Sequence, residues 1–175
     1  MNIAVDAMGG DNAPLEVVKG AINAALEYKD LNITLVGDEA KIRDISREIG
    51  VVIPNNVEIL HSSSEVTMED DPMIVMKEKK DSSMAMGLKL LKEDGVDAFI
   101  SAGNTGALHT ASTLIVRKMK GVRRSAIAAI LPFDPPVLLL DSGANPVVTA
   151  DLLLQWAIIG SAYMKNVFGV ENPRV

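Results

Sequence analysis

The sequence predicts an α/β protein, a three-layer α/β/α sandwich around a largely parallel sheet. Short apolar runs alternate with segments of helical periodicity, the pattern of a parallel sheet with helices on both faces. The hydrophobic fraction is 48% and the aromatic fraction only 3%, so the core is aliphatic, as in buried parallel strands. In addition, three glycine-bearing loops each follow an apolar run and precede a helical segment.

The first third of the chain alternates strands and helices. We expect strands at Asn2–Asp6, Asn32–Gly37 and Val57–Leu60. A helix begins near Pro14, a residue that suits a first helical turn, and its apolar residues recur at helical spacing through Leu26. A second, more polar amphipathic helix covers Asp38–Ile49, and Gly50 is suited to end it.

The remaining helices and strands are predicted from the same kinds of pattern. Ser62–Pro72 is irregular and acidic, and a short helix after it ends near Lys77–Lys80. Asp81, Ser82 or Ser83 can cap the next helix, which Gly95 ends. The later elements expected are a strand at Ala98–Ser101, a helix from Asn104 to about Lys120, strands at Ala126–Leu131 and Val137–Asp141, and a helix from about Thr149 to Met164.

Composition excludes several classes of protein. The chain has no cysteine and two histidines, which excludes disulfides and thiol catalysis and disfavours a histidine-rich metal site. A net charge of −6 argues against general nucleic-acid binding. The first residues lack the basic and apolar regions of a signal peptide, and no apolar run approaches the length of about 20 residues that a membrane span needs. A cytoplasmic protein is expected.

The three loops are the candidate binding site. They are Asp6–Asp11, Ser101–Gly106 and Asp141–Asn145. Glycines let backbone approach a ligand closely, and the helix that follows points unpaired N–H groups at it, which suits a phosphate or a developing oxyanion. The candidate residues are Asp6, Gly9, Gly10, Asp11, Ser101, Gly103, Asn104, Thr105, Gly106, Asp141, Gly143 and Asn145. The alternative is plain strand-to-helix scaffolding with polar caps.

Other chemistries lack a specific motif. None of the three loops contains a Walker A sequence or a complete G-x-G-x-x-G, and no G-x-S-x-G elbow supports a serine nucleophile paired with His109. The carboxylates of Glu69–Asp71 are more simply solvated than metal-bound, so we predict neither a metal nor a cofactor. No residue stands out as a general acid or base.

Two basic clusters are candidates for docking an acidic partner. One contains Lys79 and Lys80; the other is the denser run from Arg117 to Arg124, with Lys120 and Arg123 inside it. A solvated face, or basic residues that complement a helix dipole at its carboxyl end, is the simpler alternative.

The loops and their flanks resemble the PlsX family of phosphate acyltransferases. The matching stretches are Ile3–Asp11, Lys79–Met84, Ser101–Ala107 and Leu138–Asn145. Asn12 stands where many members have His, and Ser142 replaces a frequent Val or Ala. The resemblance runs over all 175 residues but covers only about the amino-terminal half of a member. Asn172–Val175 resembles the approach to another strand. We therefore expect residues 1–175 to form a single α/β domain, the amino-terminal part of a longer catalytic domain.

The resemblance implies a reaction and its partners. An acyl group would move from an acyl carrier protein thioester to inorganic phosphate, giving acyl phosphate for glycerophospholipid synthesis. It also implies a homodimer, peripheral membrane association, and a fold related to those of phosphotransacetylases and isocitrate-type dehydrogenases. Because phosphate is itself the nucleophile, no enzyme Cys or Ser is required. The carrier protein is acidic, so the basic clusters are its candidate docking sites.

Three rival functions stay open on the sequence alone. A phosphotransacetylase-like enzyme would use coenzyme A thioesters, for which the sequence names no nucleotide pocket. A non-catalytic anion-binding module would bind phosphate without turnover. A dehydrogenase would bind a nicotinamide cofactor.

Overall fold

The computed structural model describes residues 1–175 and divides into two compact units, Met1–Arg117 and Lys118–Val175. Each unit is described by itself. None of the helices combines the length and apolarity that crossing a membrane would require.

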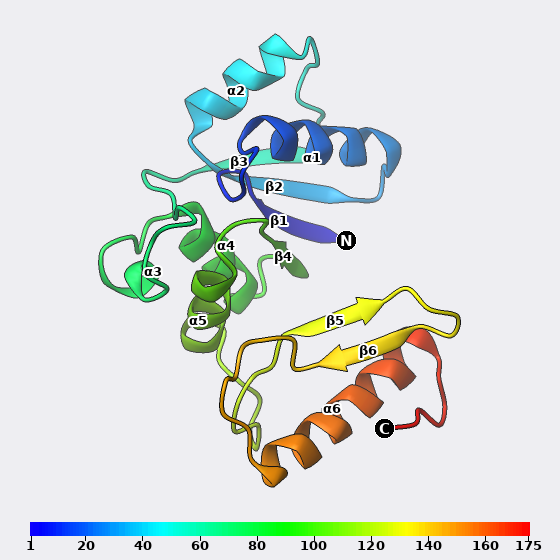
Figure 1. Cartoon of the computed structure of the whole chain (residues 1–175). Coiled ribbons are helices and arrows are strands. Elements are labelled where there is room, and N and C mark those ends of the chain that lie inside the picture. The colour runs from blue at the N-terminus through cyan, green and yellow to red at the C-terminus, as the bar shows by residue number, and fades with distance from the viewer. The chain divides into compact units, whose positions relative to one another are not determined.

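The first unit is built on a four-stranded parallel sheet (Figure 1). Its strands are β1 (Asn2–Asp6), β2 (Asn32–Gly37), β3 (Val57–His61) and β4 (Ala98–Ile100), in the spatial order β3-β2-β1-β4. In register, Ile3 of β1 lies opposite Ile33 of β2 and Ala98 of β4. For these four strands the predicted bounds are confirmed to within a residue, and their parallel pairing is confirmed.

Helices cover both faces of this sheet. The helices are α1 (Leu15–Glu27), α2 (Glu39–Glu48), the short α3 (Ile74–Lys77), α4 (Ser83–Lys92) and α5 (Thr105–Ile115). Figure 1 shows α1 and α2 on one face and α4, with α5 against it, on the other. Strand alternation explains the layers: Val5 and Leu35 pack into one core cluster with α1 and α2, while Ala4 and Val36 pack into another with α4.

Polar side chains set most helix starts in this unit. Asp38 accepts hydrogen bonds from the N–H groups of Ala40 and Lys41, and Ser82 accepts one from Ala85. Of the three predicted caps for α4, Ser82 is the one used. Gly50, with a φ of +70°, follows α2 as predicted.

Helix α5 ends at Ile115, five residues before the predicted end at Lys120. Arg117 adopts a φ of +75°, which turns the chain out of the helix. Met119 has the right spacing to extend the apolar face, but its exposed fraction is 75%. Without a surface to bury Met119, packing no longer stabilises a further turn.

The second unit contains a hairpin and one long helix. Strands β5 (Ala128–Leu131) and β6 (Val137–Leu140) pair antiparallel, because the short connection between them leaves no room for a crossover helix. Helix α6 (Ala150–Phe168) runs four residues beyond its predicted end at Met164 and stops at Gly169, whose φ is +67°.

Candidate functional site

Two of the three predicted loops meet in the first unit. β1 and β4 are parallel neighbours, so the loops that leave their carboxyl ends, Asp6–Asp11 and Ser101–Gly106, emerge side by side. The hydroxyl of Ser101 donates a 2.8 Å hydrogen bond to Oδ2 of Asp6, across 95 residues of sequence. Oδ1 of Asp6 accepts the N–H of Met8 at 3.2 Å. Only 2% of Asp6 is exposed, so its carboxylate links the loops from within.

Glycines allow these loops to pack backbone against backbone. A Cβ on Gly9 would lie 2.5 Å from Oδ2 of Asp6 and 2.9 Å from Oγ of Ser101, closer than real contacts. A Cβ on Gly103 would lie 3.2 Å from Cα of Gly9. Gly10 combines a φ of +120° with a Cβ position 3.2 Å from Ala102. Because no side chain fits between the loops, their backbone N–H groups can approach a ligand together.

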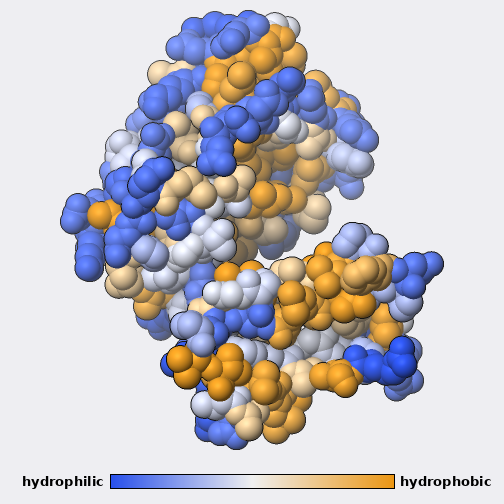
Figure 2. Space-filling model, in the orientation of Figure 1, coloured by the Kyte–Doolittle hydropathy of each residue, from blue (hydrophilic) through white to orange (hydrophobic).

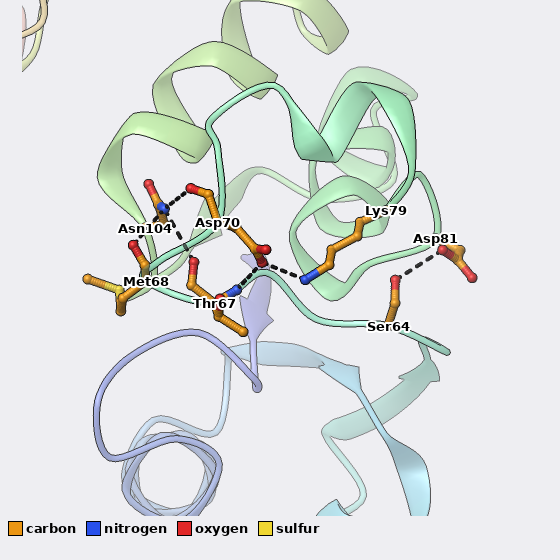
Figure 3. Close-up of polar contacts among 7 residues, drawn as sticks. All are labelled: Ser64, Thr67, Met68, Asp70, Lys79, Asp81 and Asn104. Carbon is orange, nitrogen blue, oxygen red and sulfur yellow. Dashed lines mark hydrogen bonds and ion pairs between the residues drawn. The ribbon is translucent and has the colours of Figure 1, made fainter.

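Asn104 joins the second loop to the segment formed by residues 62–82 (Figure 3). Its Oδ1 accepts the N–H of Ala107 at 3.0 Å, which caps α5. Its Nδ2 lies 3.3, 3.2 and 3.1 Å from the backbone oxygens of Thr67, Met68 and Asp70. The whole amide therefore serves the fold, which favours the capping interpretation of this residue over a ligand contact.

Asp70 and Lys79 close the 62–82 segment on itself (Figure 3). Lys79 Nζ lies 2.5 Å from Oδ2 of Asp70, and the N–H of Thr67 donates to the same oxygen at 2.7 Å. These two hydrogen bonds, with that from Lys79 the stronger, lower the pKa of the Asp70 carboxyl. Of the two lysines predicted for docking, Lys79 is engaged in this ion pair, whereas Lys80 is exposed.

Asp81 holds the other end of the same segment. Its carboxylate accepts hydrogen bonds from the hydroxyls of Ser63 and Ser64, and these lower its pKa. In the first turn of α5, a Cβ on Gly106 would lie 3.1 Å from Cγ of Pro72, so the segment also packs against the start of that helix. Thr105 and Gly106 remain exposed there, as does Asp11 in the first loop.

The third predicted loop, Asp141–Asn145, belongs to the second unit and is organised by its own aspartate. Partial burial alone would raise the pKa of Asp141, but hydrogen bonds from Ile127, Asn145 and Ala144 outweigh it and lower the pKa. Asn145 Nδ2 also donates to the backbone oxygen of Ser125 at 2.9 Å, and Gly143 has a φ of +126°. A site shared by all three loops stays a prediction.

The basic run from Arg117 to Arg124 forms a turn anchored on α6. Arg123 pairs with Asp151 at 3.1 Å and donates its backbone N–H to Gln155. The indole N–H of Trp156 donates to the backbone oxygen of Arg124 at 3.2 Å. Of the cations predicted for docking here, Arg123 is thus partly neutralised, whereas the exposed residues Arg117, Lys120 and Arg124 enter no ion pair.

Sequence reasoning missed the partners of Asn104. The oxygens that accept its hydrogen bonds are backbone atoms of Thr67, Met68 and Asp70, and no pattern of side chains predicts such contacts. It also missed the link between Asp6 and Ser101, although both residues were singled out. The one available signal was that each ends a predicted parallel strand.

A parallel sheet with glycine loops at the carboxyl ends of neighbouring strands defines an α/β protein, a class in which ligands generally bind at that edge of the sheet. A family model described as "Fatty acid synthesis protein" matches residues 1–175, and the chain belongs to that family. The resemblance to PlsX phosphate acyltransferases is confirmed.

Curated relatives carry the description "Phosphate acyltransferase". One from Acetivibrio thermocellus is 46% identical over 176 residues, covering 100% of this chain and 52% of the relative. One from Streptococcus thermophilus is 45% identical over 175 residues, covering 99% of this chain and 51% of the relative. The chain spans about half the length of the curated relatives it matches.

Solved structures show the same fold at low sequence identity. A phosphotransacetylase from Streptococcus pyogenes aligns with a TM-score of 0.72 and 16% identity, covering 98% of this chain and 55% of that one. The EutD phosphotransacetylase from Staphylococcus aureus aligns with a TM-score of 0.68 and 22% identity, covering 97% and 54%. The predicted relation to phosphotransacetylase folds is confirmed.

Proposed function

We propose that this chain is the amino-terminal part of a catalytic domain that transfers a fatty acyl group from acyl carrier protein to inorganic phosphate. Residues 1–175, with both compact units, would form one part of that domain. Family membership supports the reaction class. The junction of the Asp6–Asp11 and Ser101–Gly106 loops is the single structural observation that carries the assignment.

The junction suits phosphate for a physical reason. Phosphate needs several convergent hydrogen-bond donors, and two glycine loops without intervening side chains present backbone N–H groups at short range. The first turn of α5 adds exposed N–H groups at Thr105 and Gly106, where helix geometry supplies no carbonyl partner. Asp6 does not contact phosphate in this proposal, because its two carboxylate oxygens already accept hydrogen bonds from the N–H of Met8 and the hydroxyl of Ser101.

The chemistry requires positioning and charge stabilisation more than an enzyme nucleophile. A phosphate oxygen attacks the thioester carbonyl carbon, a C–O bond forms, and the tetrahedral oxyanion then expels the thiolate as the C–S bond breaks. The hydrogen phosphate that attacks loses its proton, and the departing thiolate of the carrier takes that proton up to become a thiol. Donors that hold phosphate beside the thioester lower the barrier by fixing the geometry of attack.

The partners follow from the family and from charge. Lys80, Arg117, Lys120 and Arg124 are exposed cations on an otherwise acidic chain, and they suit an acidic carrier protein. We extend to this chain the homodimer and the peripheral membrane association that the PlsX resemblance implies. Charge reversal at Lys120 and Arg124 should raise the KM for the acyl carrier protein substrate and spare a small thioester.

A matched pair of glycine substitutions tests the phosphate site. Gly9→Ala places a methyl group 2.5 Å from the Asp6 carboxylate, whereas Gly20→Ala places one in open space on α1. We expect Gly9→Ala to abolish phosphate binding measured by calorimetry, and Gly20→Ala to leave it unchanged. Equal binding by both variants, or no phosphate binding by the parent chain, would refute the site.

Turnover is measured separately as phosphate-dependent thiol release from palmitoyl-acyl carrier protein. Release that saturates with phosphate would support the acyltransferase. A preference for palmitoyl-coenzyme A would favour the phosphotransacetylase-like alternative. Phosphate binding without release would point to an anion-binding part that needs more of the domain for turnover.

A further inference from the structure

The second unit buries very little apolar surface. Of the 26 buried apolar residues in the chain, only Leu152, Trp156 and Met164 belong to this unit. Figure 2 shows apolar side chains gathered on its surface. Isolated exposed apolar residues are ordinary, but an extended apolar face marks a surface that another molecule covers.

A mainly apolar cavity of about 470 Å³ lies among β6, α6 and the segment of residues 170–175 that follows α6. Leu138 and Leu140 line it from the strand, and Leu153, Ala157 and Met164 line it from the helix. A Cβ on Gly160 would lie 3.5 Å from Leu138 Cδ2 and 3.7 Å from Leu140 Cδ2, so helix backbone approaches the strand closely there. Leu153 is 59% exposed at the side of this cavity.

The hairpin beside the cavity leaves backbone groups unpaired. β6 pairs only with β5, so the other edge of β6 presents a row of N–H and C=O groups without strand partners. A two-stranded hairpin is marginal by itself, and a third strand with a shared apolar face is what stabilises such units. A lipid chain could fill the cavity but could not pair these backbone groups, whereas a polypeptide strand does both.

We propose that the face formed by β6 and the cavity-lining side of α6 is the docking surface for a further polypeptide segment, which adds a strand to β6 and fills the cavity. The occupant is the part of the curated relatives that this chain does not span, about half of their length. The inference rests on the proposal of a longer catalytic domain and not on the phosphate chemistry, so its test contains no substrate.

Co-expression tests the docking directly. The full chain is produced with the carboxyl-terminal half of the Streptococcus thermophilus relative, and co-purification is quantified. Leu153→Lys should reduce recovery of the partner by at least about tenfold, because it places a charge in the buried interface. Leu154→Lys is the matched control: Leu154 is 65% exposed on the same helix but does not line the cavity. Its partner recovery should match that of the parent chain.

A footprint gives a second measurement. The chain contains no cysteine, so Leu153→Cys and Leu154→Cys are single-thiol variants. Leu153→Cys should react with maleimide in the chain alone and become about tenfold slower in the co-purified complex, while Leu154→Cys stays reactive in both.

Four results would overturn the inference. They are absence of co-purification with a partner half that accumulates, equal losses for both lysine variants, protection of Leu153→Cys in the chain alone, and protection by sodium laurate but not by the polypeptide. The last would assign the cavity to an apolar ligand. Phosphate binding by Gly9→Ala is scored independently, so failure here leaves the proposed function standing.

Discussion

The two units carry the same local pattern, a strand followed by a glycine loop and a helix, but they stabilise it differently. In the first unit, Asp6 is buried and bonds to Ser101 on a neighbouring strand, so two loops fix one another. In the second, Asp141 is only partly buried and bonds to residues of its own loop and of the adjacent strand start. The difference shows that the aspartate of a glycine loop can link it either to a second loop or to its own backbone, depending on which donors lie within reach.

The two units also differ in how many apolar residues they bury. The first unit buries 23 of the 26 buried apolar residues, on both faces of a four-stranded sheet. The second buries three, around a single helix and a hairpin. Hydrophobic burial is the main favourable term in folding, so we expect the stability of the chain to be concentrated in the first unit.

The largest expected effect is on the free energy of unfolding, from a substitution in the core of the first unit. Leu88→Ala, at a residue 2% exposed on α4, should lower the free energy of unfolding by about 2–5 kcal/mol, because it removes buried methyl groups and leaves a cavity. The same change at Leu154, 65% exposed on α6, should stay within about 0.5 kcal/mol. Urea unfolding followed by circular dichroism measures both. Similar losses at the two positions would contradict the unequal division of the core.

The sequence is sufficient for elements whose local signals agree with their packing. The strands β1, β2 and β3 are mostly apolar and are flanked by polar or glycine residues, so their bounds could be predicted directly. The early end of α5 could not, because Met119 continues the helical spacing. Spacing records which residues could share a face, and only tertiary packing decides whether that face is covered.

The candidate site, too, could be predicted from the sequence only in part. Residue types and strand ends predicted that Asp6, Gly9, Ser101 and Gly103 belong to one site. The contacts of Asn104 could not be foreseen, because its partners are backbone oxygens more than 30 residues away in an irregular segment. Long-range pairing to backbone leaves no trace in side-chain identity.

A second prediction compares the asparagines of the two loops. Asn104→Ser keeps a capping oxygen for α5 but removes the Nδ2 donors to the 62–82 segment, so it should cost about 1–3 kcal/mol through unsatisfied carbonyls. Asn145→Ser should cost less, about 0.5–1.5 kcal/mol, because its loop keeps the backbone donors to Asp141. Trypsin cleavage after Lys77 or Lys80 reports release of the segment. Cleavage unchanged in Asn104→Ser would show that other contacts hold it.

A third, smaller effect concerns the hydroxyls. Ser101→Ala removes the donor to buried Asp6 and should cost about 0.5–1.5 kcal/mol while raising the phosphate Kd. Ser142→Ala removes an exposed hydroxyl that donates to the backbone oxygen of Ile127, and it should stay within about 0.5 kcal/mol. Calorimetric phosphate titration of the two variants separates them. A loss of stability in Ser101→Ala with unchanged phosphate affinity would confine this serine to the fold.

The smallest expected effect is on stability in acid, and its measurement can distinguish the two units. The pKa values of Asp70 in the first unit and Asp141 in the second are lowered in the folded chain. Their stabilisation is therefore present above the unfolded-state pKa of about 4 and is lost as the pH falls through the lower folded-state values. Trp156 is the only tryptophan, so its fluorescence reports the second unit alone. Asp141→Asn should flatten the fluorescence change below about pH 4, and Asp70→Asn should not. Equal flattening by both variants would show that the two units lose their structure in acid as one, despite the separation of their cores.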